Sequence, residues 1–251
     1  MPHLTRHGVR IYYEEYGQGL PILLSHGFGA STGMWQGQID AFKHAYRLIP
    51  WDMRGHGQSD SPEAQALYSH QHTVEDMRAI LDHLHLEQAV IAGHSLGGFM
   101  SLLFHVHYPQ RVHALLLQGC GPGYRNAETR AQWNARTEQR AQTLQTQGLA
   151  ALGGGAEVRV SQQHSAMGLA RAARGILSQV DARVIDSLAH IAVPTLVIAG
   201  DGDTPFLNGT HYMAGHIPGA TEIIIANAGH GANVEQPEVF NQAVQRFLEQ
   251  L

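Results

Sequence analysis

The sequence predicts an α/β protein: a doubly wound, mostly parallel sheet covered by helices on both faces, with a small helical lid inserted. Short apolar runs alternate with amphipathic stretches of helical spacing along most of the chain, which is the pattern of such a sheet. Polar, glycine-rich segments follow several of the apolar runs. One such junction, within residues 89–104, places a serine between two glycines where a strand meets a helix.

Composition places the chain among globular proteins. Hydrophobic residues make up 43% of the 251 residues, and the net charge is −5. For this length we expect one core with an insertion, in which residues 1–122 and 188–251 form the core and residues 123–187 form the lid. Because the charge is modest and no run of like charges occurs, neither nucleic acid nor a membrane is expected as a partner. The oligomeric state stays open.

The chain has one cysteine, Cys120, so no internal disulfide can form. Its first residues lack the apolar stretch of a signal peptide, and no apolar run approaches the roughly 18 residues that span a membrane. A cytoplasmic protein is therefore expected. The 18 histidines are scattered, and nearly all are expected to be solvated or to pack in the core.

Two kinds of apolar pattern predict the first strands. Residues 9–16 alternate between apolar and polar and are rich in aromatic residues, as in a half-buried strand. Residues 21–25 form a continuous apolar run, typical of a strand buried on both faces of a parallel sheet. The elements expected in this part are strands over 9–16, 21–25 and 46–51 and a helix over 31–43 with Ser31 or Thr32 as its cap.

An amphipathic helix is predicted after the polar loop at 52–60, with Thr73 as its N-cap. After the serine segment, a second helix is expected to end near Pro109, because proline cannot continue it. A buried strand is predicted over 111–118. The apolar face of the first of these helices consists of Val74, Met77, Ile80, Leu81 and Leu84.

Residues 123–187 interrupt the alternation. They are rich in Gln, Arg and Ala, carry three glycines at 153–155 and have almost no β-branched runs, so several short helices are expected. Alternation then resumes, with strands over 193–200 and 221–226 and a helix over 205–215. The final helix is predicted to bury a stripe that consists of Val239, Phe240, Ala243, Val244, Phe247 and Leu248.

Ser95 is the first candidate for chemistry. An apolar run ends at Gly93, and a second run with helical character begins after Gly97. Glycine on both sides of the serine lets strand and helix approach closely, because no side chain intervenes. The serine oxygen would then stand at a helix N-terminus, near free N–H groups, where developing negative charge is stabilised.

An acid and a base are expected at other strand ends. Reactive groups on such a sheet collect at the carboxyl ends of the strands. Asp201 and Asp203 follow the strand predicted over 193–200, and His230 comes four residues after the strand that ends at 226. The chain order Ser, Asp, His is the one that a serine hydrolase built on this sheet requires.

Five other histidines were considered as bases or ligands. His94 is tied to the backbone beside the serine, and His211 and His216 fall within a predicted helix, so each is expected to be structural. His105 and His107 lie two residues apart on a helix and point in different directions, which argues against a metal site.

Five segments of the chain are similar to those of a known family: His26-Gly27-Phe28-Gly29, Asp52 to Ser59, Gly93 to Gly98, Gly200 to Asp203, and Gly229-His230. On these segments the chain resembles the α/β-hydrolase-fold serine hydrolases, in particular the carboxylesterase and enol-lactonase-like group. The resemblance runs from about residue 8 to the C-terminus and excludes most of the lid.

This resemblance implies a catalytic triad. Ser95 would be the nucleophile and His230 the general base, oriented and stabilised by an acid. Asp201 and Asp203 compete for that role. The family's acid lies three residues beyond the glycine that ends the strand, which here is Gly200, and the spacing matches Asp203.

The resemblance also implies an oxyanion hole made by the backbone N–H groups of Phe28 and Leu96. In the family, the loop that here contains Asp52, Arg54 and His56 mainly braces the sheet edge, so these three residues are expected to be structural. Trp35 and Cys120 are expected to pack in the core.

A serine nucleophile implies a carbonyl substrate, whereas the haloalkane dehalogenases and epoxide hydrolases of this fold use an aspartate. The main hypothesis is hydrolysis of carboxylic esters of small to medium acyl chain, with no cofactor and no metal. The alternative is a lactonase resembling 3-oxoadipate enol-lactonase, suggested by the loop at 52–57 and by residues 133–136. A substrate carboxylate would need a cation, which Arg125, Arg130 or Arg136 could supply.

Three further possibilities use the same scaffold. Hydrolysis of carbon–carbon bonds and perhydrolysis employ the same triad and are expected less than ester hydrolysis. A non-catalytic receptor for small molecules would belong to a different class. The substrate depends on the shape of the pocket beneath the lid, which the sequence does not define.

Overall fold

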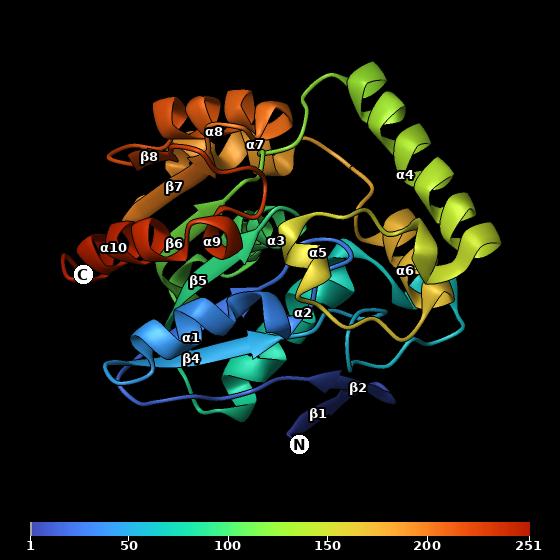
Figure 1. Ribbon diagram of the computed structural model, residues 1–251, viewed down its shortest axis with the longest axis horizontal. Helices are drawn as coiled ribbons and strands as arrows, with labels where there is room; N and C mark the ends of the chain where they lie inside the picture. Colours follow the sequence, from blue (N-terminus) through green and yellow to red (C-terminus); the bar gives the residue numbers. More distant parts are fainter. Residues whose placement is uncertain (1) are drawn as a thin grey trace.

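A six-stranded sheet in the order β4-β3-β5-β6-β7-β8 forms the centre of the structure, a computed structural model that describes residues 2–251. Every neighbouring pair of strands in it is parallel. Helices cover both faces (Figure 1), so the predicted fold class is confirmed. The strands are β3 (Leu20–Ser25), β4 (Tyr46–Trp51), β5 (Ala89–His94), β6 (Val112–Gln118), β7 (Thr195–Gly200) and β8 (Thr221–Ile225).

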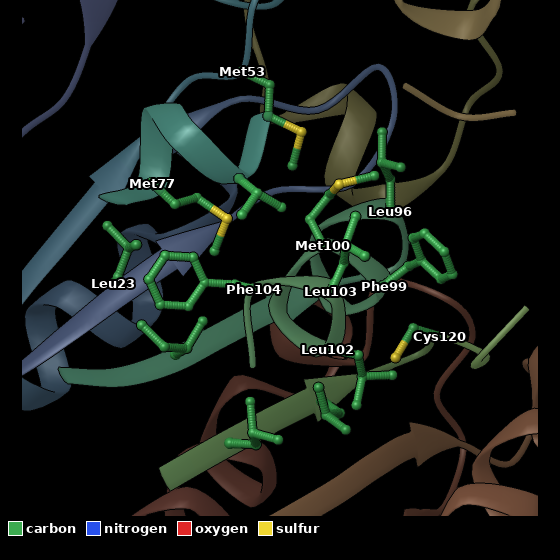
Figure 2. Packing of buried hydrophobic residues seen from close by; sticks show 14 of the residues in the cluster. Leu23, Met53, Met77, Leu96, Phe99, Met100, Leu102, Leu103, Phe104 and Cys120 are labelled. Atoms are coloured by element: carbon green, nitrogen blue, oxygen red, sulfur yellow. The ribbon is translucent and has the colours of Figure 1, made fainter. Parts of the chain in front are cut away.

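The alternation of side chains along each strand builds one apolar core on each face. In β5, Ala89 and Ile91 belong to one cluster, whereas Val90 and Ala92 belong to the other. Figure 2 shows part of the first cluster, where Phe104 lies beside Met77 and Leu23. That cluster is covered by α2 (His70–His83), α3 (Leu96–His107) and α8 (Thr204–His216), and the other by α1 (Gln36–Phe42) and α10 (Pro237–Leu248).

A hairpin that was not predicted precedes the sheet. β1 (His3–Arg6) pairs antiparallel with β2 (Val9–Tyr12) through a two-residue turn. The strand expected over 9–16 therefore ends early as a regular element. Its continuation still joins the edge of the main sheet, through antiparallel bridges from Tyr13 to Trp51 and from Tyr16 to Leu48.

One predicted helix start was wrong, and a second was correct in position but lacks a side-chain cap bond. The helix expected to begin at Thr73 is α2, and its N-cap is Ser69, whose side chain accepts a hydrogen bond from the His72 N–H. Thr73 lies inside the helix, where its hydroxyl donates to the Ser69 carbonyl oxygen. The helix expected over 31–43 has Ser31 at its N-cap position as predicted, although its first turn is 3₁₀ and the Ser31 side chain makes no cap bond.

The stripe predicted for the final helix was correct except at Val239. Phe240, Ala243, Val244, Phe247 and Leu248 are buried in α10, whereas Val239 is 48% exposed. Neighbouring residues on a helix lie about 100° apart, so Val239 points away from the stripe that Phe240 begins.

The segment 123–187 contains helices of unequal length. The longest, α4, packs against α6 through Ala141, Leu144, Leu169, Ala170 and Ala173. The last one, α7, packs against α3, and its Val184 belongs to the main core. The elements of this segment are α4 (Ala127–Gln147), η4 (Gly148–Ala151), α5 (Ala156–Arg159), α6 (Ala166–Gly175) and α7 (Arg183–Ser187).

Short helices complete the chain: η1 (Thr32–Trp35), η2 (Gln65–Leu67), η3 (Pro109–Arg111), η5 (Leu188–His190) and α9 (Ala232–Glu235). Within residues 2–251, none of the helices combines the length and the hydropathy that crossing a bilayer requires.

Candidate active site

The turn from β5 into α3 holds Ser95 in a strained conformation. Its φ is 53° and its ψ is −114°, a region that costs a non-glycine residue on the order of 1–3 kcal/mol. A Cβ on Gly93 would lie 2.2 Å from the Gly97 carbonyl carbon, and one on Gly97 would lie 2.2 Å from the Ser25 oxygen. Neither position has room for a side chain, and the turn projects Ser95 at the start of α3.

Asp203 and His230 meet at the neighbouring strand ends. His230 Nδ1 lies 2.8 Å from Asp203 Oδ2, and Asp203 is only 3% exposed. The ring of Phe206 stacks on the His230 ring at 4.7 Å between centroids. Asp201 lies elsewhere: it is exposed, and its Oδ1 accepts a hydrogen bond from the Ala228 N–H at 3.3 Å. Of the two acids considered, Asp203 faces the histidine.

Ser95 is the next residue in the chain after His94, which contacts His230. Within residues 2–251, its hydroxyl makes no hydrogen bond to the His230 ring. The ring of His94, the residue before the serine, lies 4.4 Å from the His230 ring between centroids. Hydrogen bonds between nucleophile and base are often long in ligand-free sites and shorten when substrate binds.

The two backbone N–H groups expected to form the oxyanion hole are those of Phe28 and Leu96. Among the hydrogen bonds of residues 2–251, neither the Phe28 nor the Leu96 N–H has an acceptor. Leu96 is the first residue of α3, where a helix leaves its N–H groups unpaired. The loop of residues 26–31, which we call the Phe28 loop, comes close to Ser95, because a Cβ on Gly27 would lie 3.2 Å from the Ser95 Cβ.

His94 contacts the backbone of His230, which the sequence did not indicate. Its Nε2 lies 2.9 Å from the His230 carbonyl oxygen. A carbonyl oxygen only accepts, so Nε2 carries the proton and donates it. Complete burial and the nearby His230 lower the pKa of His94 well below its usual value, which keeps the ring neutral.

The buried loop at 52–60 braces this part of the molecule, as expected. Asp52 accepts hydrogen bonds from the N–H groups of Thr32 and Gln58, each at 2.8 Å, and burial raises its pKa to about 7. Arg54 is fully buried in an ion pair with Asp76. These contacts join the loop to η1 and to α2.

His26 holds the same loop from the other side. Its Nε2 accepts a hydrogen bond from the Met53 N–H at 2.9 Å, and its Nδ1 donates to the Gly27 oxygen at 2.7 Å. Burial lowers the pKa of His26 to about 4, which favours the neutral ring that this pattern requires.

A second set of contacts joins the Phe28 loop to the segment after α5. Gln163 Nε2 donates to the Ala30 oxygen at 2.8 Å, and Gln163 Oε1 accepts from the Gly57 N–H at 2.9 Å. The Ser31 N–H donates to Ser161 Oγ at 2.9 Å. We call these contacts the seam. No sequence signal pointed to Gln163, because its partners are more than 100 residues away.

The remaining candidates lie in structural positions. His211 contacts Glu222, and His216 contacts the Tyr212 oxygen, both on α8 away from Ser95. Trp35 and Cys120 are buried in the core, as expected. Residues 2–251 contain no cluster of three or more His, Cys, Asp or Glu side chains that could hold a metal ion.

The parallel sheet, the strained turn after β5 and the Asp–His pair beyond β7 and β8 are the features of an α/β hydrolase. A family model described as the alpha/beta hydrolase fold matches residues 21–159, and the chain belongs to this family. The protein is therefore a hydrolase.

Three similar proteins illustrate the family. The chain is 33% identical to 3-oxoadipate enol-lactonase 1 of Acinetobacter baylyi over 92% of this chain and 89% of that protein. Est816, described as an N-acyl homoserine lactone degrading enzyme, is 30% identical, with a TM-score of 0.77 over 98% of this chain and 100% of that one. A thermophilic esterase from Thermogutta terrifontis shares the fold, with a TM-score of 0.85, 24% identity and coverage of 100% and 99%.

Proposed function

We propose that the protein hydrolyses carboxylic esters of small to medium acyl chain through an acyl-enzyme on Ser95. The observation that carries the proposal is the 2.8 Å hydrogen bond between His230 and the buried Asp203, beside a serine held in a strained turn. Asp203 fixes the tautomer in which His230 Nε2 is free to accept a proton. The relatives named as lactonases, which are 33% and 30% identical to this chain, also support hydrolysis of an ester bond.

The geometry supports the following steps. His230 accepts the hydroxyl proton as Ser95 Oγ attacks the carbonyl carbon. The oxyanion that forms accepts hydrogen bonds from the backbone N–H groups of Phe28 and Leu96. The intermediate collapses, and the alcohol leaves with the proton from His230. Water then attacks the acyl carbon while His230 accepts a proton from it. His230 returns this proton to Ser95 Oγ, and the acid is released. With a lactone the leaving alcohol stays attached to the acyl group.

We also propose that residues 123–187 act as a lid over this site. The seam holds the lid against the Phe28 loop. A contact from α4 supports this role, since the guanidinium of Arg140 lies 5.5 Å from the centroid of the Phe28 ring.

The second candidate is hydrolysis of a lactone that carries a carboxylate. The enol-lactonase relative favours it, and so does Arg140, which is exposed, lies over Phe28 and forms no ion pair within residues 2–251. Two of the arginines considered from the sequence have other partners. Arg125 pairs with Asp186, and Arg130 donates to the backbone oxygens of Tyr124 and Arg125.

A fluorophosphonate probe and a substrate panel test the proposal. We expect the probe to label the wild-type protein and not Ser95→Ala, with both proteins equally folded by circular dichroism. The panel compares kcat/KM for p-nitrophenyl esters of increasing chain length with that for lactones. Labelling of Ser95→Ala would refute the choice of nucleophile.

The same panel separates the alternatives. Activity on enol-lactones far above that on p-nitrophenyl acetate would overturn the preference for simple esters and support the lactonase. Absence of both labelling and hydrolysis would support a non-catalytic receptor. Hydrolysis of carbon–carbon bonds or perhydrolysis with slow ester turnover would favour the two remaining reactions.

A further inference from the structure

Gln118, the last residue of β6, is bonded to the backbone of the proposed nucleophile. Its carbonyl oxygen accepts a hydrogen bond from the Ser95 N–H at 2.8 Å. Gln118 is fully buried, and it is paired with His94 in the register of β5 and β6. The position in which β5 presents Ser95 therefore depends on the end of β6.

The side chain of Gln118 is bonded to the helix that follows the proposed base. Its Nε2 donates a hydrogen bond to Asn233 Oδ1 at 2.8 Å, and Asn233 is buried in α9, which begins two residues after His230. Figure 1 shows α9 beside β6. Through one backbone and one side-chain hydrogen bond, Gln118 thus joins the turn that carries Ser95 to the element that follows His230.

Gly119, the next residue in the chain, lies against the acid–base pair. Its φ is 52°, and a Cβ at this position would lie 3.1 Å from Asp203 Oδ2 and 3.3 Å from His230 Nδ1. The chain therefore passes directly from the Ser95 contact to the Asp203–His230 hydrogen bond. All three residues that we propose for the triad lie close to the end of β6.

Asn233 is also held from a second side, by a network of buried amides. Its Nδ2 donates to the Met34 oxygen at 2.9 Å and to Gln38 Oε1 at 3.0 Å. Gln38 Nε2 donates in turn to Asn241 Oδ1 at 2.9 Å, and Asn241 lies half-buried on α10 at the outer end of the network. The network anchors α9 to α1 and α10, and Gln118 connects it with the central sheet.

Packing alone does not account for a glutamine at position 118. Within residues 2–251, its Oε1 atom is buried and has no hydrogen-bond partner, which lowers stability. A methionine of similar size would fill the space without this cost. What the glutamine adds is the bond from its Nε2 to Asn233.

We propose that Gln118 is a positioning residue, which acts through Asn233 to hold His230 in place relative to Ser95. The proposal rests on the acyl-enzyme mechanism argued above. In that mechanism His230 takes the proton of Ser95 and delivers it to the alcohol oxygen as the bond from the acyl carbon to this oxygen breaks. A displaced imidazole impairs this delivery most when the leaving group cannot depart as an anion.

Two esters of butyric acid separate alignment from folding. Methyl butyrate has a leaving oxygen that must be protonated, whereas p-nitrophenyl butyrate releases a phenolate that is stable without a proton. Because both form the same acyl-enzyme, the ratio of their kcat/KM values measures proton delivery by His230. A smaller amount of folded protein lowers both values equally and leaves the ratio unchanged. Acid release in a pH-stat and the absorbance of nitrophenolate give the two rates.

Three substitutions each replace an amide by an apolar side chain of similar size. Gln118→Met and Asn233→Leu break the bond between these two residues from opposite ends. Asn241→Leu is the matched control, because it removes a hydrogen bond from the same network at its outer end. The double variant of Gln118→Met and Asn233→Leu tests whether Gln118 acts through Asn233.

We expect Gln118→Met to lower kcat/KM by about tenfold for methyl butyrate and by about threefold for p-nitrophenyl butyrate, because a slightly displaced base still assists attack but delivers the proton poorly. Asn233→Leu should change the ratio in the same direction, and it decides the matter if Gln118→Met folds poorly. The double variant should change the ratio no further than Asn233→Leu does. Asn241→Leu should keep the wild-type ratio even if its Tm falls.

Equal losses on the two esters in Gln118→Met and Asn233→Leu would show that Gln118 only supports the fold, and the inference would be wrong. A change of ratio in Asn241→Leu as large as in Gln118→Met would also overturn it, and so would a further change when Gln118→Met is added to Asn233→Leu. Failure of the proposed function looks different: the wild-type protein would hydrolyse neither ester, and the fluorophosphonate probe would not label Ser95.

Discussion

The side chain of His94 donates a hydrogen bond to the backbone oxygen of His230 at 2.9 Å. The residue that precedes the proposed nucleophile therefore holds the residue proposed as the base. Asp203 holds the same imidazole through its Nδ1 atom. His230 is thus fixed at its ring and at its backbone by two different strand ends, which limits how far it can move relative to Ser95.

Replacing His94 by Ala should lower kcat by about tenfold or more with little change in KM, because a base displaced by a fraction of an ångström is poorly aligned for proton transfer. His94→Gln retains an N–H donor and should recover part of the loss. Steady-state kinetics on a p-nitrophenyl ester measure both parameters. An unchanged kcat in a protein of lower Tm would mean that His94 acts only in packing.

The pair Asp201 and Asp203 provides a matched comparison. Asp203→Asn should lower kcat by a factor on the order of 10,000, because an amide no longer favours the tautomer that leaves His230 Nε2 free. Asp201→Asn should leave kcat nearly unchanged, since Asp201 is exposed and bonds only to the Ala228 N–H. Equal losses in the two variants would contradict the assignment of the acid.

Gln163 should affect catalysis without touching substrate. Gln163→Ala removes the contacts to Ala30 and Gly57 and should loosen the loop that presents the Phe28 N–H. We expect kcat to fall by about 10- to 100-fold, within the range seen for small displacements and lost oxyanion donors. Gln162→Ala is the control, because the Gln162 side chain is exposed and only its backbone N–H contacts Ser31. Similar kinetics for the two variants would rule out this role.

Stability should decrease as the pH falls below about 6.5. Burial lowers the pKa of His26 to about 4 and that of His56 and His94 well below the usual value. At a pH between these lowered pKa values and about 6.5, the pKa of histidine in the unfolded chain, the unfolded chain binds protons that the folded protein does not. Each such histidine can therefore contribute a loss of about 1.4 kcal/mol per pH unit.

Asp52 acts in the opposite direction. Its pKa is raised to about 7 in the folded protein, whereas an aspartate in the unfolded chain loses its proton above about pH 4. Between these two pH values the folded state holds a proton that the unfolded state has released. The contribution of Asp52 to stability is therefore lost as the pH rises through 7. Urea unfolding at pH 7, 6 and 5 measures the balance, and three histidines should outweigh one aspartate. An unfolding free energy that is constant or rises toward pH 5 would contradict the expectation. Asp52→Asn should make the loss steeper.

The sheet and the triad candidates were predictable because both depend on local pattern. Buried strands such as 21–25 show as continuous apolar runs, and the reactive residues follow the strand ends directly in the chain. The start of α2 was mistaken because Ser69 and Thr73 are both good caps, and the choice between them depends on which turn the surrounding loop allows. The hairpin at the N-terminus has only four residues per strand, too few for a clear alternation.

The contacts that tune the site were not predictable in the same way. Nothing in the sequence distinguishes His94 and Gln163 from other polar residues. Each acquires its role from a partner more than 100 residues away along the chain. Burial decides their roles, and burial here depends on how the segment 123–187 folds back onto the sheet. Its weak apolar periodicity gave no information about that packing.

The seam divides the segment 123–187 into parts with different freedom to change. Residues 161–163 are bonded to the Phe28 loop and to Gly57, so substitutions there would disturb the proposed oxyanion donors. α4 packs chiefly against α6 and η4. With residues 123–187 acting as the proposed lid, α4 is therefore the element whose exchange for another helix is expected to change the range of substrates and to leave the proposed catalytic residues in place.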